Sequence, residues 1–233
     1  MQATPPPMVP YLSLPQRVWG ILVSPRVVIE YLKERPSSLG VLVAMVILIL
    51  ANTLPIMGIL VEAEMDKLAD RGLTAEQMVT QEKVMRITIP VVGPIFALIA
   101  VFAGAGIMLF LSNVILGGQA TYRQLLALLA HAQMVWIPAT LVKVPLTLIS
   151  GKPVVTSPAA FLSSDAEQGF LWQLMNQMDI FSLWILGLSA LGLGILAGTT
   201  TGRAATALGI TWGIFVLVLA GLGAALQGLG GGG

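Results

Sequence analysis

The side chains that could do chemistry in this 233-residue chain are few, and they stand within or beside long apolar runs. The sequence has a single histidine, His131, and no cysteine. One imidazole without any thiolate cannot form an HExxH zinc site, a multi-histidine metal site, a disulfide or a cysteine nucleophile. We therefore expect no metal and no cofactor.

Motifs for nucleophilic or phosphate chemistry are also missing from the sequence. It contains no GxSxG elbow, no GxxxxGK[ST] phosphate loop and no GxGxxG turn after a strand. An intramembrane serine hydrolase could pair His131 with Ser112 or Ser182, but neither serine has the glycine-flanked context that such a nucleophile needs. The sequence predicts a protein that is not an enzyme and has no catalytic residues.

Four polar side chains fall inside apolar runs, namely Asn52, Asn113, His131 and Gln133. Polar residues within a membrane span often have a function, so these four side chains have two possible interpretations. They could line a path for a proton or a small solute, or they could hydrogen-bond across helices and fix the packing. A transporter should also show an intramembrane carboxylate or paired broken helices, so we favour packing. Lys143, near the end of the third apolar run, is expected to snorkel toward water.

The composition excludes a soluble protein. Charged residues make up 10% of the chain, against about 25% in globular proteins. Hydrophobic residues make up 56%, and the mean hydropathy is +0.89. The net charge of +1 offers no basic patch for a polyanion, so nucleic acid is not an expected partner. The class is integral membrane protein.

Spanning a bilayer takes about 20 mostly apolar residues. The expected fold is all-α, a membrane domain over residues 36–226 with five transmembrane helices and additional interfacial amphipathic helices. The predicted spans are 39–61, 87–116, 125–149, 180–198 and 204–226. Because five is odd, the two termini should lie on opposite sides. The first apolar block is too long for a cleavable signal peptide, so we expect it to anchor the chain.

The distribution of cations sets the expected orientation. If the N-terminus is inside, six cations are cytoplasmic and five are external, and Lys143 could be counted as a sixth external one. The two sides are therefore nearly equal in positive charge. Four cations precede the first span, and the two short loops GGQATYR and TTTGR each end in an arginine with no acid beside it. We therefore predict a cytoplasmic N-terminus and an external C-terminus.

The flanking segments have their own patterns. Residues 1–15 are proline-rich and predicted to be disordered, and the glycine-rich residues 227–233 should form a flexible tail. Residues 16–35 are predicted to form a cytoplasmic amphipathic segment, in which Ser24-Pro25 caps a helix that should run to about Glu34 and stop before Pro36. It would lie in the headgroup layer or pack on the bundle as a short helix.

Helix-capping signals mark the longer connections. Thr74 and Gln77 form a capping box that predicts a helix leading into the second span, and Ser164 and Glu167 form another before an amphipathic stripe. Asp179 is expected to cap the fourth span.

The last two spans carry small residues at every fourth position. Such spacing allows close approach of helices within one bundle or between copies. The residues are Ala190, Gly194 and Gly198 in the fourth span and Ala205, Gly209 and Gly213 in the fifth.

Three stretches together resemble one family. They are the Ser-Pro-led entry SPRVVIEYLKERPSSLGVLVAMVIL, the segment GGQATYRQLLALLAHAQMVWIPATL and the segment beginning MDIFSLWILGLSALGLG. Their matching positions are Gly117, Gly118, Thr121, Tyr122, Leu125, Ala132, Pro138, Asp179, Phe181, Ser182, Trp184 and Gly192. In order and spacing, over about residues 15–225, they resemble the prokaryotic branch of the YIP domain family, the Ypt/Rab-interacting five-span membrane proteins.

The resemblance implies a five-helix bundle with a cytoplasmic N-terminus in a bacterial inner membrane. Eukaryotic relatives bind prenylated Rab GTPases, but this chain has a short N-terminal region and no DLYGP-type motif, so we do not expect GTPase binding. The family provides no catalytic residue to transfer.

Together these features predict a non-enzymatic membrane protein that organises or assists other membrane components as a trafficking or export accessory or a scaffold. Its partners would be the lipid bilayer and either another membrane protein or a second copy of the chain. The alternative is a small transporter or channel-like permease with a polar path near Asn52, Asn113, His131 and Gln133. Convergence of these four on one cavity would favour transport, whereas dispersed and paired side chains would favour a scaffold.

Overall fold

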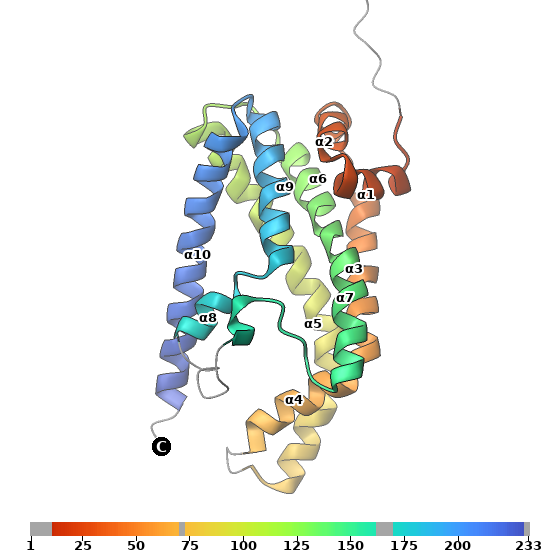
Figure 1. The fold of residues 1–233 in the computed structure, drawn as a ribbon, viewed down its shortest axis with the longest axis vertical. Coiled ribbons are helices and arrows are strands. Elements are labelled where there is room, and N and C mark those ends of the chain that lie inside the picture. The colour runs from red at the N-terminus through yellow and green to blue at the C-terminus, as the bar shows by residue number, and fades with distance from the viewer. Residues whose placement is uncertain (1–10, 70–72, 162–169, 231–233) are drawn as a thin grey trace, which may run out of the picture.

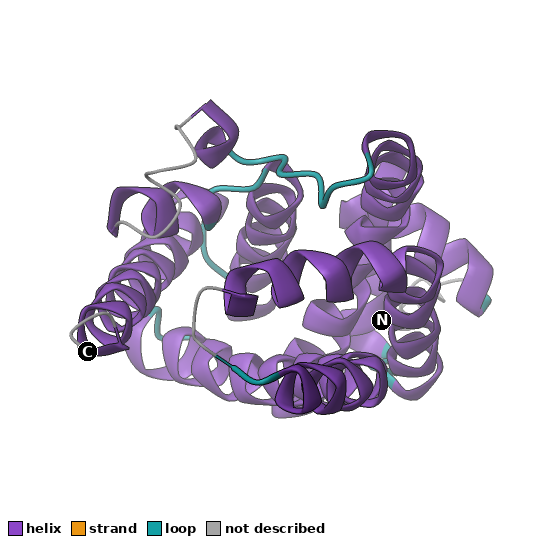
Figure 2. Ribbon diagram, turned by 90° about the horizontal axis from the view of Figure 1, so that it is seen from below, coloured by secondary structure: helices purple, strands orange, loops and turns teal. Residues whose placement is uncertain are grey.

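The computed structural model describes residues 11–69, 73–161 and 170–230. Every element of secondary structure in these residues is a helix (Figures 1 and 2). Five helical stretches are long and apolar enough to cross a membrane: Leu39–Ala69, Ala75–Ile115, Tyr122–Ser150, Ile180–Ala197 and Thr201–Gly223. The predicted all-α membrane fold with five spans is confirmed. Several stretches extend beyond the predicted apolar cores, because helices continue into the charged segments that flank them.

Three of the spans are built from more than one helical element. The first joins α3 (Leu39–Thr53), η1 (Leu54–Ile56) and α4 (Met57–Ala69); the second joins α5 (Ala75–Phe110) and the π-helical turn η2 (Leu111–Ile115). The third joins α6 (Tyr122–Ala132), η3 (Gln133–Val135) and α7 (Trp136–Ser150). The tighter turn at η1 contains Pro55, which cannot donate the backbone hydrogen bond of a regular α-helix.

The fourth span is α9 (Ile180–Ala197) and the fifth belongs to α10 (Thr201–Gly230). Between the third and fourth spans lie η4 (Pro158–Phe161) and α8 (Phe170–Asn176), the latter packed beside α10 (Figure 1). The predicted capping box at Ser164 lies outside the described residues.

The N-terminal segment contains the helix predicted from Ser24-Pro25 to about Glu34 and, in addition, a helix before it that was not predicted. It forms two helices, α1 (Leu14–Val23) and α2 (Pro25–Glu34), which meet at Ser24. Pro25 is the first residue of α2, a position where a backbone N–H has no partner within the helix, so its absence costs nothing. The same proline cannot continue α1, which therefore ends before it. Disorder was expected through residue 15, but α1 begins at Leu14, where Ser13 and Gln16 form a capping box. Residues 1–10 lie outside the described range.

The two N-terminal helices pack on the bundle with one face. Ile21, Ile29 and Leu32 are fully buried, and the pair contacts α3, α6 and α9. Trp19 and Val27 stay largely exposed on the other face. The structure therefore has the packed helix that was one of the two alternatives, with an apolar outer face in addition.

The core of the bundle centres on α6, which contacts α2, α3, α5 and α9. Leu125, Ala127 and Leu128 are fully buried. Thr121 caps this helix by accepting a hydrogen bond from the backbone of Gln124, and the Gln124 side chain donates to the Lys33 carbonyl at the end of α2. The capping box predicted at Thr74 is also present at the start of α5.

The C-terminal end corrects another expectation. Helix α10 continues to Gly230, although a flexible tail was expected from residue 227. A glycine in a helix costs only about 1 kcal/mol relative to alanine, so a long preceding helix can carry several. Residues 231–233 lie outside the described range.

Candidate functional site: a polar cleft and an ion pair

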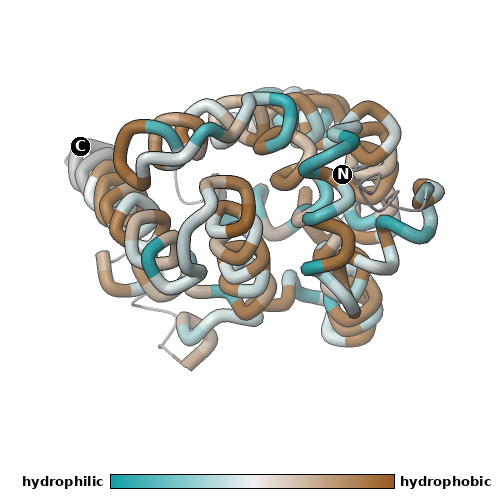
Figure 3. Tube along the Cα trace, turned by 90° about the horizontal axis from the view of Figure 1, so that it is seen from above, coloured by the Kyte–Doolittle hydropathy of each residue, from teal (hydrophilic) through white to brown (hydrophobic). Residues whose placement is uncertain are grey.

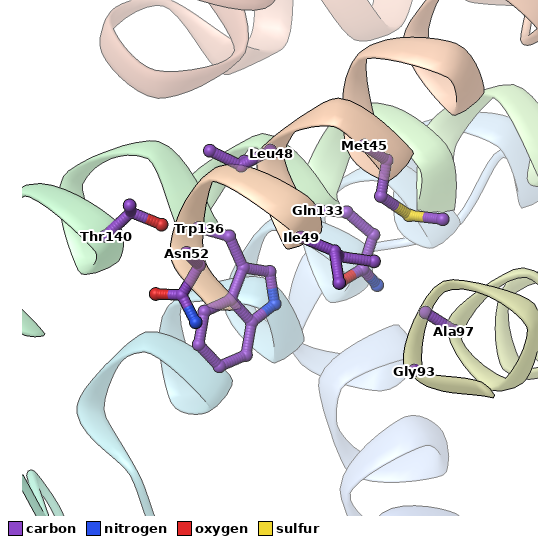
Figure 4. A pocket seen from close by; sticks show the side chains of 9 residues that line it. All are labelled: Met45, Leu48, Ile49, Asn52, Gly93, Ala97, Gln133, Trp136 and Thr140. Carbon is purple, nitrogen blue, oxygen red and sulfur yellow. The ribbon is translucent and has the colours of Figure 1, made fainter. Parts of the chain in front are cut away.

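Two of the four polar side chains singled out in the sequence meet in one cleft. Asn52 of the first span and Gln133 of the third line a cleft of about 260 Å³ between α3, α5 and α7 (Figure 4). Thr140 and Trp136 share it, and neither was predicted. The remaining lining residues are Met45, Leu48, Ile49, Gly93 and Ala97.

The chemistry of this cleft is hydrogen bonding. Asn52 Oδ1 and Thr140 Oγ1 are buried and have no hydrogen-bond partner among the described residues. The lining contains no carboxylate, imidazole or ammonium group. The cleft could therefore hold a polar group within an apolar molecule, but its lining supplies no general acid or base.

The other two polar side chains do not join the cleft. His131 is fully buried in α6, and its Nδ1 lies 2.7 Å from the carbonyl oxygen of Ala127. Its Nε2 has no partner among the described residues, so it forms no dyad there with Ser112 or Ser182. Asn113 donates from Nδ2 to the Ala120 carbonyl at 3.1 Å and so holds the turn between the second and third spans.

Beyond the cleft, Lys143 and Asp179 form an ion pair. Lys143 was expected to snorkel toward water, but its Nζ donates to Asp179 Oδ2 at 2.9 Å. Their side chains are 19% and 12% exposed. The ammonium also lies 5.1 Å from the ring centre of Trp136 and 5.6 Å from that of Phe181. A counter-ion and two aromatic faces replace water here, which explains why the lysine stays inside.

Asp179 is held by several donors at once. It caps α9, as predicted, because its Oδ1 accepts the backbone N–H groups of Phe181 at 2.8 Å and Ser182 at 3.4 Å. Thr156 donates its hydroxyl to Oδ2. Burial alone would raise the pKa of Asp179, but the hydrogen bonds from Thr156 and Lys143, the charge of Lys143 and the N–H of Phe181 together lower it.

This lowered pKa predicts how stability depends on pH. A carboxyl whose pKa is lower in the folded state stabilises the fold above its unfolded value of about 3.8 and loses that contribution as pH falls through the folded value. We expect the difference in free energy of unfolding between the native chain and Asp179→Asn to be constant above about pH 5 and to shrink below pH 4. Denaturation of both in detergent across this range measures it, and a difference independent of pH would contradict the assignment.

Comparison with known proteins places these features in a family. Residues 19–222 match the family model described as the Yip1 domain, which covers most of the chain. The chain belongs to the Yip1 domain family. This Yip1-domain chain is also 28% identical over 204 residues to "Membrane protein YknW" of Bacillus subtilis (strain 168), covering 86% of this chain and 87% of the relative. No solved structure matches it.

Membership confirms the family resemblance found in the sequence. The matched range contains four of the five helices that could cross a membrane and all but the last residue of the fifth, so this is a multi-pass Yip1-domain membrane protein with a bacterial homologue. Members of the family are generally non-enzymatic membrane proteins.

Three glycines of the Yip1 domain lie where two segments approach each other closely. A Cβ on Gly118 would lie 2.6 Å from Ala197 Cα, and one on Gly192 would lie 2.3 Å from the side chain of Leu128. A Cβ on Gly194 would lie 3.2 Å from the backbone of Thr201. The described residues contain no cluster of three or more His, Asp or Glu side chains that could bind a metal ion.

The two small-residue stripes of the Yip1 domain differ. Ala190 is buried in α9, whereas Gly198 ends that helix in a left-handed conformation with φ +67°. In α10, Ala205 is exposed, and a Cβ on Gly209 or Gly213 would meet no atom within 4 Å. The side of α10 formed by Ala205, Gly209 and Gly213 is called here the open face, because a Cβ added to either glycine would enter open space, although both glycines are half-buried.

Proposed function

We propose that this chain is a non-enzymatic membrane protein that organises or assists other membrane components, as a trafficking or export accessory or a scaffold. It would do so by binding a transmembrane helix of another membrane protein on the open face of α10. The observation that supports this is the empty space beside Gly209 and Gly213. Small residues with free space beside them let the backbone of a second helix approach closely in lipid.

The exposure of the fifth span agrees with this proposal. Only 11% of its most apolar window is buried, the lowest share among the five spans. The side of α10 that packs within the chain uses Ala204, Leu208, Val216 and Ala220. The open face lies beside this stripe, so a partner helix could bind there without displacing α9.

The proposal predicts a loss of partner when the open face is filled. We expect Gly209→Leu to leave the chain folded and to reduce co-purification of a stoichiometric membrane partner at least about tenfold, since close helix contact would be blocked. Purification in mild detergent followed by quantitative mass spectrometry measures this. Gly106→Leu is the matched control, because a Cβ there also meets no atom within 4 Å. Equal partner recovery from Gly209→Leu and the native chain would refute the proposal.

A transporter is the second candidate, supported by the cleft that Asn52, Gln133 and Thr140 share. Against it, His131 and Asn113 each bond to a backbone carbonyl away from the cleft. If Asn52→Ala and His131→Ala left the protein folded but abolished uptake or efflux in liposomes, transport would replace the accessory role.

The proposed setting is a bacterial cell membrane, with the N-terminus in the cytoplasm and the C-terminus outside. The chain has no native cysteine, so single cysteines can be introduced at will. We expect the variants Gln2→Cys and Gly231→Cys to react with a membrane-impermeant maleimide from opposite sides, the second from outside. Labelling of both from one side would contradict five spans, and labelling of Gln2→Cys from outside would reverse the orientation.

A further inference from the structure

One buried cation of the N-terminal region, Arg17, has no counter-ion among the described residues. Arg17 of α1 is 9% exposed, and its Nε is buried without a hydrogen-bond partner in the described chain. The ion pairs found among the described residues involve Lys67, Arg86 and Lys143, not Arg17. A buried guanidinium needs compensation for its lost hydration, so something negative should complete this site.

The contacts of Arg17 direct it to the start of the first span. Its Nη1 donates to the Ser37 hydroxyl, and its guanidinium carbon lies 5.8 Å from the ring centre of Tyr31. Ser37 directly precedes Ser38, which is the N-cap of α3. Figure 1 shows α1 lying against this end of α3, and α1 and α3 are in contact.

The N-terminus of α3 offers donors at the same place. The side chain of Ser38 makes no cap hydrogen bond, so it does not satisfy the N–H groups of the first turn. These groups and the positive end of the helix dipole favour an anion. The fork of a guanidinium suits a phosphate, which can accept from two nitrogens at once.

The surroundings favour a lipid as the source of that phosphate. Leu39, the first residue of the span, is 78% exposed, and Ser37 is exposed beside it. Trp19 and Tyr11 are 67% and 72% exposed in the same N-terminal region, and both residue types are enriched at membrane–water interfaces. Figure 3 views this end of the molecule, where hydrophilic segments border hydrophobic ones.

We infer that Arg17, Ser37, Ser38 and the first turn of α3 bind the headgroup phosphate of an anionic phospholipid in the leaflet at the N-terminal end. The acyl chains would run along the exposed apolar start of α3. This site is independent of the open face of α10 and of any protein partner bound there.

The test uses the full chain, purified in a lipid-depleting detergent and mixed with phosphatidylglycerol, diacylglycerol or inorganic phosphate. Native mass spectrometry and the shift in unfolding temperature measure binding. We expect phosphatidylglycerol to bind and stabilise the native chain, and Arg17→Gln to weaken binding at least about tenfold, as expected for a charge-assisted hydrogen bond. Arg17→Lys should fall between them, because it keeps the charge but loses the fork.

Two controls distinguish lipid binding at this site from non-specific attraction of anionic lipid to surface cations and from the effects of misfolding. Arg26→Gln, which changes an exposed cation on α2, should bind lipid like the native chain. Without lipid, Arg17→Gln should be no less stable than the native chain, since it removes an uncompensated charge. If it fails to fold, Ser37→Ala with Ser38→Ala tests the site with Arg17 intact and should also weaken binding.

Undiminished binding of phosphatidylglycerol to a folded Arg17→Gln, or to the double serine variant, would overturn the proposal. Equal stabilisation by inorganic phosphate and phosphatidylglycerol would also overturn it, because the site would then select a free anion. Equal binding of diacylglycerol would show that the phosphate is not recognised.

Discussion

Asp179→Ala is expected to lower the free energy of unfolding by about 3 kcal/mol. The substitution removes the cap of α9, which is worth about 1 kcal/mol in typical helices. It also leaves Lys143 unpaired at 19% exposure between two aromatic rings. Removing one partner of a buried ion pair costs more free energy than the intact pair contributes to stability, because the remaining charge keeps its desolvation penalty. Equilibrium unfolding in detergent measures the change.

An exposed ion pair supplies the matched control for this prediction. Glu82 and Arg86 form an i,i+4 pair on α5 with side chains 43% and 51% exposed. Glu82→Ala should cost less than about 1 kcal/mol, as is usual for surface pairs. Adding Lys143→Met to Asp179→Ala should restore part of the lost stability. Equal costs for Asp179→Ala and Glu82→Ala would show that the pair is solvated.

Gly118→Ala is expected to destabilise the fold by about 1–3 kcal/mol through overpacking. The new Cβ would lie 2.6 Å from the Cα and 2.9 Å from the carbonyl oxygen of Ala197. These are backbone atoms at the end of α9, so no side-chain rotation relieves the clash. Either the turn between the second and third spans or the end of the fourth span must move.

Gly187→Ala on α9 is the control for this second prediction. A Cβ there meets no atom within 4 Å, and alanine is the better helix former, so stability should hold or rise by up to about 1 kcal/mol. Thermal unfolding of both variants in the same detergent makes the comparison. A Gly118→Ala chain as stable as the native one would mean that these segments are not in contact.

The sequence was sufficient for features that depend on neighbouring residues. Runs of apolar residues predicted the five spans, and the pair Thr74 and Gln77 predicted the start of α5. The aspartate before an apolar run predicted the cap at Asp179. Each of these depends on hydrophobicity or on side chains within three or four residues of one another, which the sequence displays directly.

Features that depend on distant segments could not be predicted in this way. Lys143 and Asp179 are 36 residues apart, so the lysine alone was expected to reach water. Thr140 and Trp136 line the cleft only because α3 and α5, which are distant in the sequence, lie beside α7. Arg17 looked like one of several cations before the first span, and only the packing of α1 on the bundle buries it.

The placement of the polar residues weighs on the choice between the two functions. Two of the four share a cleft without a titratable group, and the other two bond to local backbone carbonyls. This dispersed arrangement favours a packing role for His131 and Asn113. It leaves the open face of α10 as the surface on which an accessory role depends.

Site-specific photo-cross-linking in native membranes tests that role most directly. The probe must not fill the open face itself, so it is placed at Ile210, which is 60% exposed and adjoins Gly209. A photoreactive amino acid there should form a covalent adduct with one membrane protein, whereas the same residue at Phe96 on α5, which is 70% exposed, should react with lipid. A specific protein adduct at Ile210 alone is the predicted result. Lipid adducts at both positions, with no protein partner at Ile210, would contradict the account.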